Sequence, residues 1–141
     1  MKVSDILKGK VSNIYSVTGE VSVYDAIKVM GEKNIGALLI MEGDKLTGIL
    51  SERDYARKVV LKGKSSRETP VKDIMTEQVL TVTPGDTIEK CMAIMTDKHI
   101  RHLPVVEDSR VLGMISIGDV VNSIIESQKE TIAHLQSYIA Q

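Results

Sequence analysis

The sequence has few of the residues that mark extracellular, membrane or nucleic-acid-binding proteins. Cys91 is the only cysteine, which excludes an internal disulfide, and its place on an apolar helix face predicts a buried, inert thiol. Phe and Trp are absent, so any core must be aliphatic. No apolar run approaches the roughly 20 residues of a membrane span, and the first residues lack the apolar stretch of a signal peptide. We therefore expect a cytoplasmic protein without membrane insertion.

The charge of the chain is nearly balanced. It has 18 Lys and Arg against 19 Asp and Glu, a net charge of −1. Because no basic stripe with interleaved aromatic residues appears, we do not expect a nucleic-acid partner. His99 and His102 are three residues apart, but they precede a strand and no third ligand accompanies them. No catalytic triad or acid–base pair can be assembled either. We therefore predict neither a metal site nor a catalytic residue, and no enzyme.

The chain repeats itself once. An offset of 65 residues aligns residues 17–60 with residues 82–125 without a gap. A short leader repeats at an offset of 68, which matches Val3, Asp5 and Ile6 with Val71, Asp73 and Ile74. Two copies are too few for a solenoid. They predict a pseudo-symmetric pair of small units that share one compact module, which is the size that 141 residues allow.

Each copy closes with the same motif, glycine, two apolar residues, serine, two further residues and aspartate. The motif spans residues 48–54 and 113–119, where a strand-like run turns into a helix-like one. One interpretation is a capping box, with Ser51 or Ser116 as N-cap and Asp54 or Asp119 at N3. The other is a helix N-terminus that binds phosphate, with the aspartate accepting hydrogen bonds from a ribose diol. The repetition favours the second interpretation, and both remain open.

The hydrophobic pattern predicts strand, helix, strand, strand, helix in each copy, an α+β fold. Ser22 is the expected N-cap of the first helix, whose end we place at Gly36. The continuous apolar run at residues 37–41 predicts a strand covered on both faces. An extended segment at residues 12–17 should precede this helix, and a turn at residues 42–45 should follow the strand. We divide the chain into a first repeat with its leader (1–62), a linker (63–70), a second repeat (71–126) and a C-terminal helical extension (127–141).

The extension continues a helical apolar pattern past the second repeat. Val121, Ile125, Ile132, Leu135 and Ile139 keep spacings of three and four residues, with Gln128 as the one polar position. A helix from Asp119 to the end would reach about 35 Å, longer than a repeat needs. It could fold back on its own module. We expect it instead to pair with a second copy, because a seam broken by one polar residue resembles the register-fixing device of helical homodimers.

Taken together, the leader, the repeat offset and the closing motif resemble those of the CBS domain pair, or Bateman module, of the stand-alone type. This resemblance covers almost the whole chain. It implies two β-α-β-β-α repeats packed by pseudo-twofold symmetry, with clefts between their sheets that hold adenosyl ligands such as AMP, ADP, ATP, NAD or S-adenosylmethionine. AMP is our first expectation. The implied function is a regulatory sensor that signals to a partner, an enzyme or a transporter; the alternative is a homodimeric scaffold with vestigial clefts.

Carried onto this chain, the resemblance implies that Asp54 and Asp119 bind ribose, with Ser51 and Ser116 near phosphate. The further residues that it implies in the clefts are Thr18 and Thr83, Gly36, Ala37 and Leu38, and Arg101, His102, Leu103 and Pro104. The first copy departs from the family pattern because it lacks the proline. From the residues themselves, Arg53 and Arg57 flank Asp54, whereas Ile117 and Gly118 occupy the region before Asp119. We therefore expect the ligand at Asp54 to depend more on phosphate.

Overall fold

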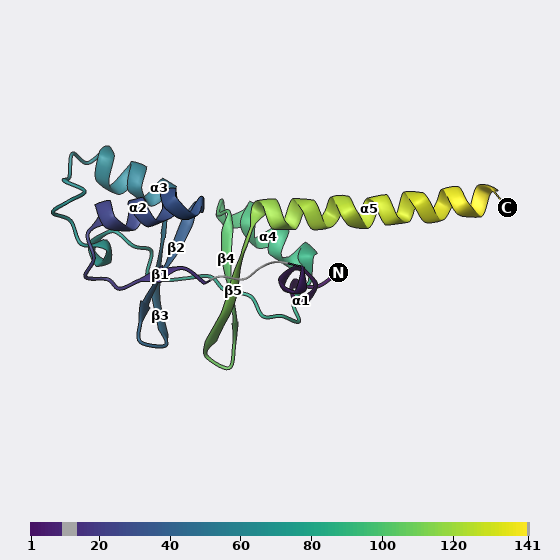
Figure 1. Ribbon diagram of the computed structural model, residues 1–141, viewed down its shortest axis with the longest axis horizontal. Coiled ribbons are helices and arrows are strands. Elements are labelled where there is room, and N and C mark those ends of the chain that lie inside the picture. Colours follow the sequence, from purple (N-terminus) through teal and green to yellow (C-terminus); the bar gives the residue numbers. More distant parts are fainter. Residues whose placement is uncertain (10–13, 141) are drawn as a thin grey trace. The chain divides into compact units, whose positions relative to one another are not determined.

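The computed structural model describes residues 1–9 and 14–140 (Figure 1). The start of the extended segment predicted at residues 12–17 and the last residue of the predicted C-terminal helix lie outside these described residues. The chain forms two compact units. Unit 1 comprises Met1–Ser12, Thr81–Glu107 and Leu112–Gln141, and unit 2 comprises Asn13–Leu80 and Asp108–Val111. Each has an aliphatic core, as the absence of Phe and Trp requires.

Unit 2 contains the first repeat, built around a three-stranded sheet. Its elements in chain order are β1 (Ser16–Val17), α2 (Val23–Lys33), β2 (Ala37–Glu42), β3 (Lys45–Ser51), α3 (Glu52–Tyr55), the π-helix η1 (Ala56–Val60) and the 3-10 helix η2 (Val71–Asp73). Strand β2 lies between β1, to which it is parallel, and β3, to which it is antiparallel. Residues 37–40 are at most 1% exposed, which confirms the predicted strand covered on both faces.

Unit 1 contains the second repeat. Its elements are α1 (Val3–Lys8), α4 (Ile88–Lys98), β4 (His102–Glu107), β5 (Arg110–Ser116) and the long helix α5 (Ile117–Ala140). The mixed α+β fold with two related repeats and an extended C-terminal helix is the predicted one. None of the helices in the described part of the chain combines the length and the apolar character that a bilayer crossing needs.

The first strand of the second repeat is the main departure from the predicted pattern. It is reduced to Val82, which forms a single parallel bridge with Val105. In the first repeat, the Leu39 N–H donates to the Tyr15 carbonyl at 3.4 Å, beside β1. The residue that corresponds to Leu39 is Pro104, which has no N–H to donate. The same proline that fits the family pattern therefore removes one bond of this ladder.

The end of the first helix was also predicted wrongly. Helix α2 ends at Lys33 and its C-cap is Asn34, with φ of 54°, rather than Gly36. Asparagine tolerates the left-handed conformation better than most residues, and it occupies a position where glycine is common. The predicted N-cap at the other end is confirmed, because the Asp25 N–H donates to Ser22 Oγ at 3.1 Å.

Each leader packs on the repeat that it does not precede in the sequence. The Val3 N–H donates to the Asp86 carbonyl in unit 1, and the Val71 N–H donates to the Val21 carbonyl in unit 2, both at 2.9 Å. These two bonds are related by the repeat. Asp86 and Val21 are separated by the repeat offset of 65 residues, and Val71 and Val3 by the leader offset of 68. The domain boundaries predicted from the sequence place each leader with the repeat that follows it. The compact units instead place each leader with the repeat on which it packs.

The glycine of each closing motif is where a leader side chain approaches the sheet. A Cβ atom added at Gly48 would lie 2.5 Å from Met75 Sδ and 3.1 Å from the Thr76 carbonyl oxygen. A Cβ atom at Gly113 would lie 3.1 Å from Leu7 Cδ2. Leu7 and Met75 are equivalent leader residues. The glycine thus makes room for the exchanged leader, which gives a structural reason for the first position of the motif.

Candidate functional site

The closing motif of the first repeat joins β3 to α3 through a capping box. The Asp54 N–H donates to Ser51 Oγ at 3.1 Å, and the Ser51 N–H donates to the Asp54 carboxylate at 3.0 Å. The Ser51 hydroxyl also donates to that carboxylate at 3.0 Å. Two backbone N–H groups at the helix start are thereby satisfied. The first of the two interpretations of this motif therefore holds here.

The closing motif of the second repeat has the same geometry. The Asp119 N–H donates to Ser116 Oγ at 3.1 Å, and the Ser116 N–H donates to the Asp119 carboxylate at 2.8 Å. This box begins α5, which is 24 residues long, whereas the helix in the first repeat changes to a π-helix after Tyr55. A capping box does not exclude ligand binding, because a carboxylate has about four lone-pair positions in all.

The start of a strand lies beside each of these helix starts. The Glu52 N–H donates to the Gly36 carbonyl at 3.2 Å, and Ala37 pairs with Ser51 in the sheet. At the equivalent place in unit 1, the Ile117 N–H donates to the Arg101 carbonyl at 2.8 Å. The structure therefore brings the predicted strand-start residues next to the closing motif in both repeats.

Asp54 has further partners that the motif alone does not predict. Lys58 Nζ lies 3.1 Å from one carboxylate oxygen of Asp54 and donates to the Ile74 carbonyl, also at 3.1 Å. The Thr76 hydroxyl approaches the carboxylate at 3.3 Å. Asp54 is only 9% exposed. With the two groups of Ser51, four donors face a carboxylate with about four lone-pair positions, so a ribose diol must displace one of them.

Sequence reasoning missed both of these partners. Lys58 follows Asp54 by four residues, a spacing at which opposite charges meet on a helix, and this signal was available. Thr76 belongs to the exchanged leader, and its pairing with Ile49 through two backbone bonds brings it to Asp54. No spacing in the sequence indicates that contact, because it depends on which repeat the leader packs against.

The other predicted site residues divide into exposed and buried groups. The exposed ones are Thr18, Arg53, Arg57, Thr83 and Arg101, while His102 is half-buried at the start of β4. The buried ones are Ala37, Leu38, Leu103 and Pro104. The buried side chains belong to the cores, so these four positions can offer only backbone groups to a ligand. This is the role that the resemblance gives to the start of each strand.

Thr83 takes part in a local turn that perturbs a nearby carboxyl group. Its N–H donates to the Asp86 carboxylate at 2.7 Å, and Lys90 Nζ pairs with the same carboxylate at 3.0 Å. The Thr83 N–H, followed by the Lys90 ammonium, holds the pKa of Asp86 below its ordinary value of 3.8. Both favour the ionised form. The backbone N–H of Thr83 is thus already used within the turn.

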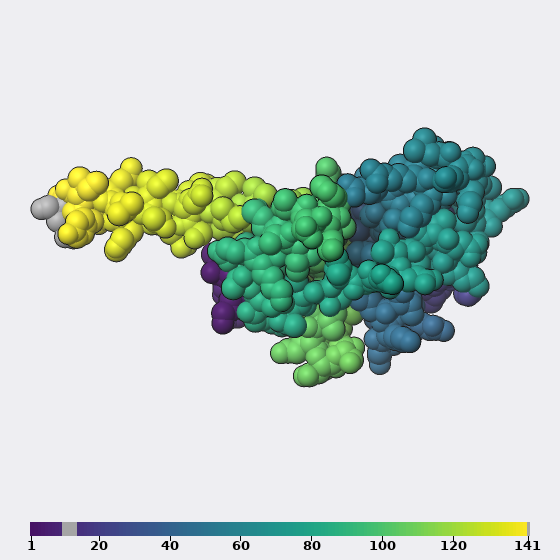
Figure 2. Space-filling view, turned by 180° about the vertical axis from the view of Figure 1, so that it is seen from behind, coloured from purple at the N-terminus to yellow at the C-terminus, as the bar shows by residue number. Residues whose placement is uncertain are grey.

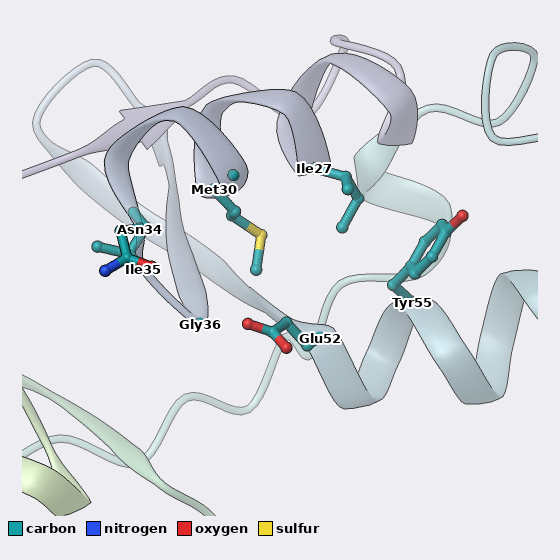
Figure 3. Close-up of a pocket in the computed structure, with 8 residues that line it drawn as sticks. Ile27, Met30, Asn34, Ile35, Gly36, Glu52 and Tyr55 are labelled. Atoms are coloured by element: carbon teal, nitrogen blue, oxygen red, sulfur yellow. The ribbon is translucent and has the colours of Figure 1, made fainter.

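A hollow of about 460 Å³ opens in unit 2 between the end of α2 and the start of α3 (Figure 3). Its lining includes Gly36 and Glu52, together with the apolar side chains of Ile27, Met30 and Tyr55. The volume is typical of small-molecule sites. However, Asp54 does not line it, since the Asp54 carboxylate faces Lys58 and Thr76 instead. Only Gly36 is shared between the hollow and the predicted site.

Residues 1–9 and 14–140 contain no group of three or more His, Cys, Asp or Glu side chains that could hold a metal ion. His99 is the C-cap of α4, and His102 begins β4. Cys91 is fully buried, and burial raises the pKa of its thiol.

Comparison with known proteins identifies the family of the chain. The family model for the CBS domain matches residues 3–61 and 71–126. The chain belongs to the CBS domain family. The mitochondrial CBS domain-containing protein CBSX3 of Arabidopsis thaliana is 42% identical in an alignment over 147 residues. The alignment covers 97% of this chain and 71% of the relative. Because this relative is named as mitochondrial, the cytoplasmic location of the present CBS protein stays a prediction.

Two solved structures extend the comparison. A protein with CBS domains from Burkholderia ambifaria MC40-6 is 51% identical, with a TM-score of 0.88, covering 91% of this chain and 96% of that one. A CBS domain pair in complex with 5′-methylthioadenosine and S-adenosyl-L-methionine is 27% identical, with a TM-score of 0.79, covering 90% and 98%. The chain is therefore a tandem CBS protein, and one similar pair binds adenosyl compounds.

Proposed function

We propose that this CBS protein is a regulatory module that binds an adenosyl ligand at the closing motif of each repeat. The observation that carries the proposal is the repeated geometry, in which a serine-capped helix start, an aspartate and the start of a strand meet in both units. The adenosyl compounds bound by a similar CBS pair support the ligand class. AMP is the first ligand to test, and ADP, ATP, NAD and S-adenosylmethionine are the others.

In this proposal the two aspartates accept hydrogen bonds from the ribose hydroxyls. The helix starts at Ser51 and Ser116 lie near phosphate, where the partial positive charge of a helix N-terminus favours an anion. The backbone at the starts of β2 and β4 meets the base. No group in this arrangement performs a reaction, so we assign the chain binding and signalling rather than catalysis.

The two sites differ in this proposal. Arg53 and Arg57 are exposed beside Asp54, where a guanidinium can make two hydrogen bonds to a phosphate. Calorimetry on the Asp119→Ala background isolates the first site. There, Arg53→Ala should weaken AMP binding about tenfold or more and leave adenosine binding unchanged. An equal loss for both ligands, or no loss, would show that Arg53 is not a phosphate ligand.

A second candidate function has one specific observation in its favour. The carboxylate of Asp54 already faces four donors, as a purely structural group would. If ribose cannot displace the long Thr76 contact, the first site is vestigial and the chain is a scaffold. Replacing Thr76 with Val removes this competitor. Tighter binding by the Thr76→Val variant would show that ribose reaches Asp54.

The decisive experiment measures the melting temperature while each of the five ligands is titrated. A ligand at 100 times its dissociation constant adds about 2.7 kcal/mol to the free energy of unfolding. Asp54→Asn and Asp119→Asn should each remove one binding event, at a cost of about tenfold or more in affinity. Asp25→Asn is the matched control, because Asp25 is also at N3 of a serine-capped helix but outside the motifs.

Three results would contradict the proposal in different ways. If none of the five ligands shifts the melting temperature, the adenosyl class is wrong. If both motif variants bind as the unmodified chain does, the motifs are capping boxes only. If Asp25→Asn weakens binding as much as they do, the effect is indirect.

We also propose that the chain acts as a homodimer, and that its partner is a regulated enzyme or transporter.

A further inference from the structure

Helix α5 has two apolar faces, and its own unit covers only one of them. Val120 is buried, and Ile117 and Ile124 pack against the core of unit 1. The second face, here called the seam, consists of Val121, Ile125, Gln128, Ile132, Leu135 and Ile139. Its five apolar members are between 41% and 81% exposed. Figures 1 and 2 show the C-terminal part of α5 running past α1 and α4 of its unit, and residues 125–140 are all exposed.

The spacing of the seam indicates what covers it. Its members alternate intervals of four and three residues, so that equivalent positions recur every seven residues, as Ile125, Ile132 and Ile139 do, and the repeat has a period of 3.5. A stripe with this period stays in contact only with another helix that supercoils around it, whereas a straight helix on a globular surface follows a period of 3.6. The seam is therefore suited to a coiled coil rather than to a groove.

The residue types favour two strands and a fixed register. Written as heptads, Ile125, Ile132 and Ile139 occupy the a positions, while Val121, Gln128 and Leu135 occupy the d positions. Isoleucine at every a position, with leucine at one of the three d positions, is closest to the combination that favours parallel dimers. In a parallel pair the two Gln128 side chains face each other and can exchange amide hydrogen bonds. A shifted or antiparallel pairing would bury each amide against an apolar residue, at a cost.

Charge is compatible with a second copy of the same chain. In residues 126–140, Glu126 and Lys129 pair on their own helix at 3.7 Å, and Glu130 lies on the outer face. Only Lys129 flanks the seam, so two copies bring no like charges into contact. A membrane surface would call for a polar face rich in Lys and Arg, which this helix lacks.

We infer that residues 121–139 of α5 form a parallel two-stranded coiled coil with a second copy of the chain. This inference rests on the proposed homodimer and names its surface. It is independent of ligand binding, which involves the start of α5 and not the seam.

The first test measures molar mass by light scattering at about 10 μM for the full chain and three variants. Truncation after Ser127 should give a monomer. Ile132→Lys should raise the dissociation constant about 100-fold or more, because two unpaired charges would be buried in each dimer. Ser137→Lys is the matched control, since it adds the same charge on the outer face and should leave the dimer intact. All three variants should keep a cooperative melting transition, which would show that they still fold, and only the two that lose the dimer should melt at a lower temperature than the full chain.

The second test fixes the orientation by cross-linking. Gln128→Cys in a Cys91→Ser background should form a disulfide between copies under mild oxidation, because only a parallel pair in register brings position 128 against itself. Ser137→Cys in the same background should not.

The outcomes distinguish failure of the proposed seam from failure of the proposed homodimer. A dimer that persists after truncation, or with Ile132→Lys, overturns the seam but leaves the homodimer standing. A monomeric full chain overturns both, and leaves the seam to a different partner or to its own module. A full chain that is trimeric or larger overturns the two-stranded arrangement. Equal cross-linking at positions 128 and 137 overturns the parallel register.

Discussion

A methyl group added at Gly48 tests whether the second leader lies on the first repeat. In Gly48→Ala the new Cβ atom would lie 2.5 Å from Met75 Sδ, 2.9 Å from Met75 Cγ and 3.1 Å from the Thr76 carbonyl oxygen. The sulfur end of Met75 can move. The Thr76 carbonyl cannot move easily, because it accepts from the Ile49 N–H at 3.0 Å while the Thr76 N–H donates back to Ile49.

Overpacking of this kind costs about 1–3 kcal/mol. For a chain of this size that corresponds to a fall of about 3–9 °C in melting temperature. Gly113→Ala should cost less, because its added Cβ atom meets only the flexible end of Leu7 at 3.1 Å. Gly31→Ala in α2 is the control. No atom lies within 4 Å of its added Cβ atom, so it should stabilise the helix by about 0.5–1 kcal/mol.

Urea unfolding of these three variants, with Met75→Ala and the double variant Gly48→Ala with Met75→Ala, completes a double-mutant cycle. The cost of Gly48→Ala should fall by about 1 kcal/mol when Met75 is already alanine, because the contact with the sulfur is gone. If Gly48→Ala is as harmless as Gly31→Ala, or if its cost is the same with and without Met75, the leader does not lie on Gly48 and the exchange of leaders is wrong.

Two further predictions concern ionisable groups in unit 1. The pKa of Asp86 is lowered in the folded chain, so its contribution to stability is present above its ordinary pKa of 3.8 and is lost as the pH falls through the lower folded value. Urea unfolding of Asp86→Asn should therefore show a deficit at pH 5–7 that shrinks below pH 4, and a deficit constant down to pH 2 would contradict this. Cys91 should react with a thiol reagent only as fast as the chain unfolds, because it is fully buried and its thiol pKa is raised. Complete labelling of the folded protein within minutes would show that it is accessible.

The sequence determined the features that depend on local pattern and on repetition. The offset of 65 residues predicted two related units, and the continuous run at residues 37–41 predicted a strand covered on both faces. The spacing of serine and aspartate in the closing motifs indicated a capping box as one of two interpretations, and both repeats form that box. Each of these signals either spans a few neighbouring residues or recurs at a fixed interval. It can therefore be recognised without knowledge of distant contacts.

Local chemistry also explains two errors in the predicted elements. The N–H that Pro104 lacks shortens the first strand of the second repeat, and this could have been read from the sequence. Asn34 ends α2 in a left-handed conformation. The prediction chose Gly36, two residues later, because glycine is the more common residue at a helix end. Both errors came from weighing one local signal above another.

Only the tertiary structure decided that Thr76 is a partner of Asp54. The i, i+4 spacing indicates the contact of Asp54 with Lys58, whereas Thr76 belongs to a leader 22 residues away. Backbone hydrogen bonds hold the leader on the repeat, and Gly48 leaves room for the Met75 side chain. Neither feature corresponds to a fixed spacing in the sequence, so neither could be predicted from it. Long-range packing of this kind arises because the apolar side chains of a leader are buried wherever the sheet offers room, and that choice is made in three dimensions.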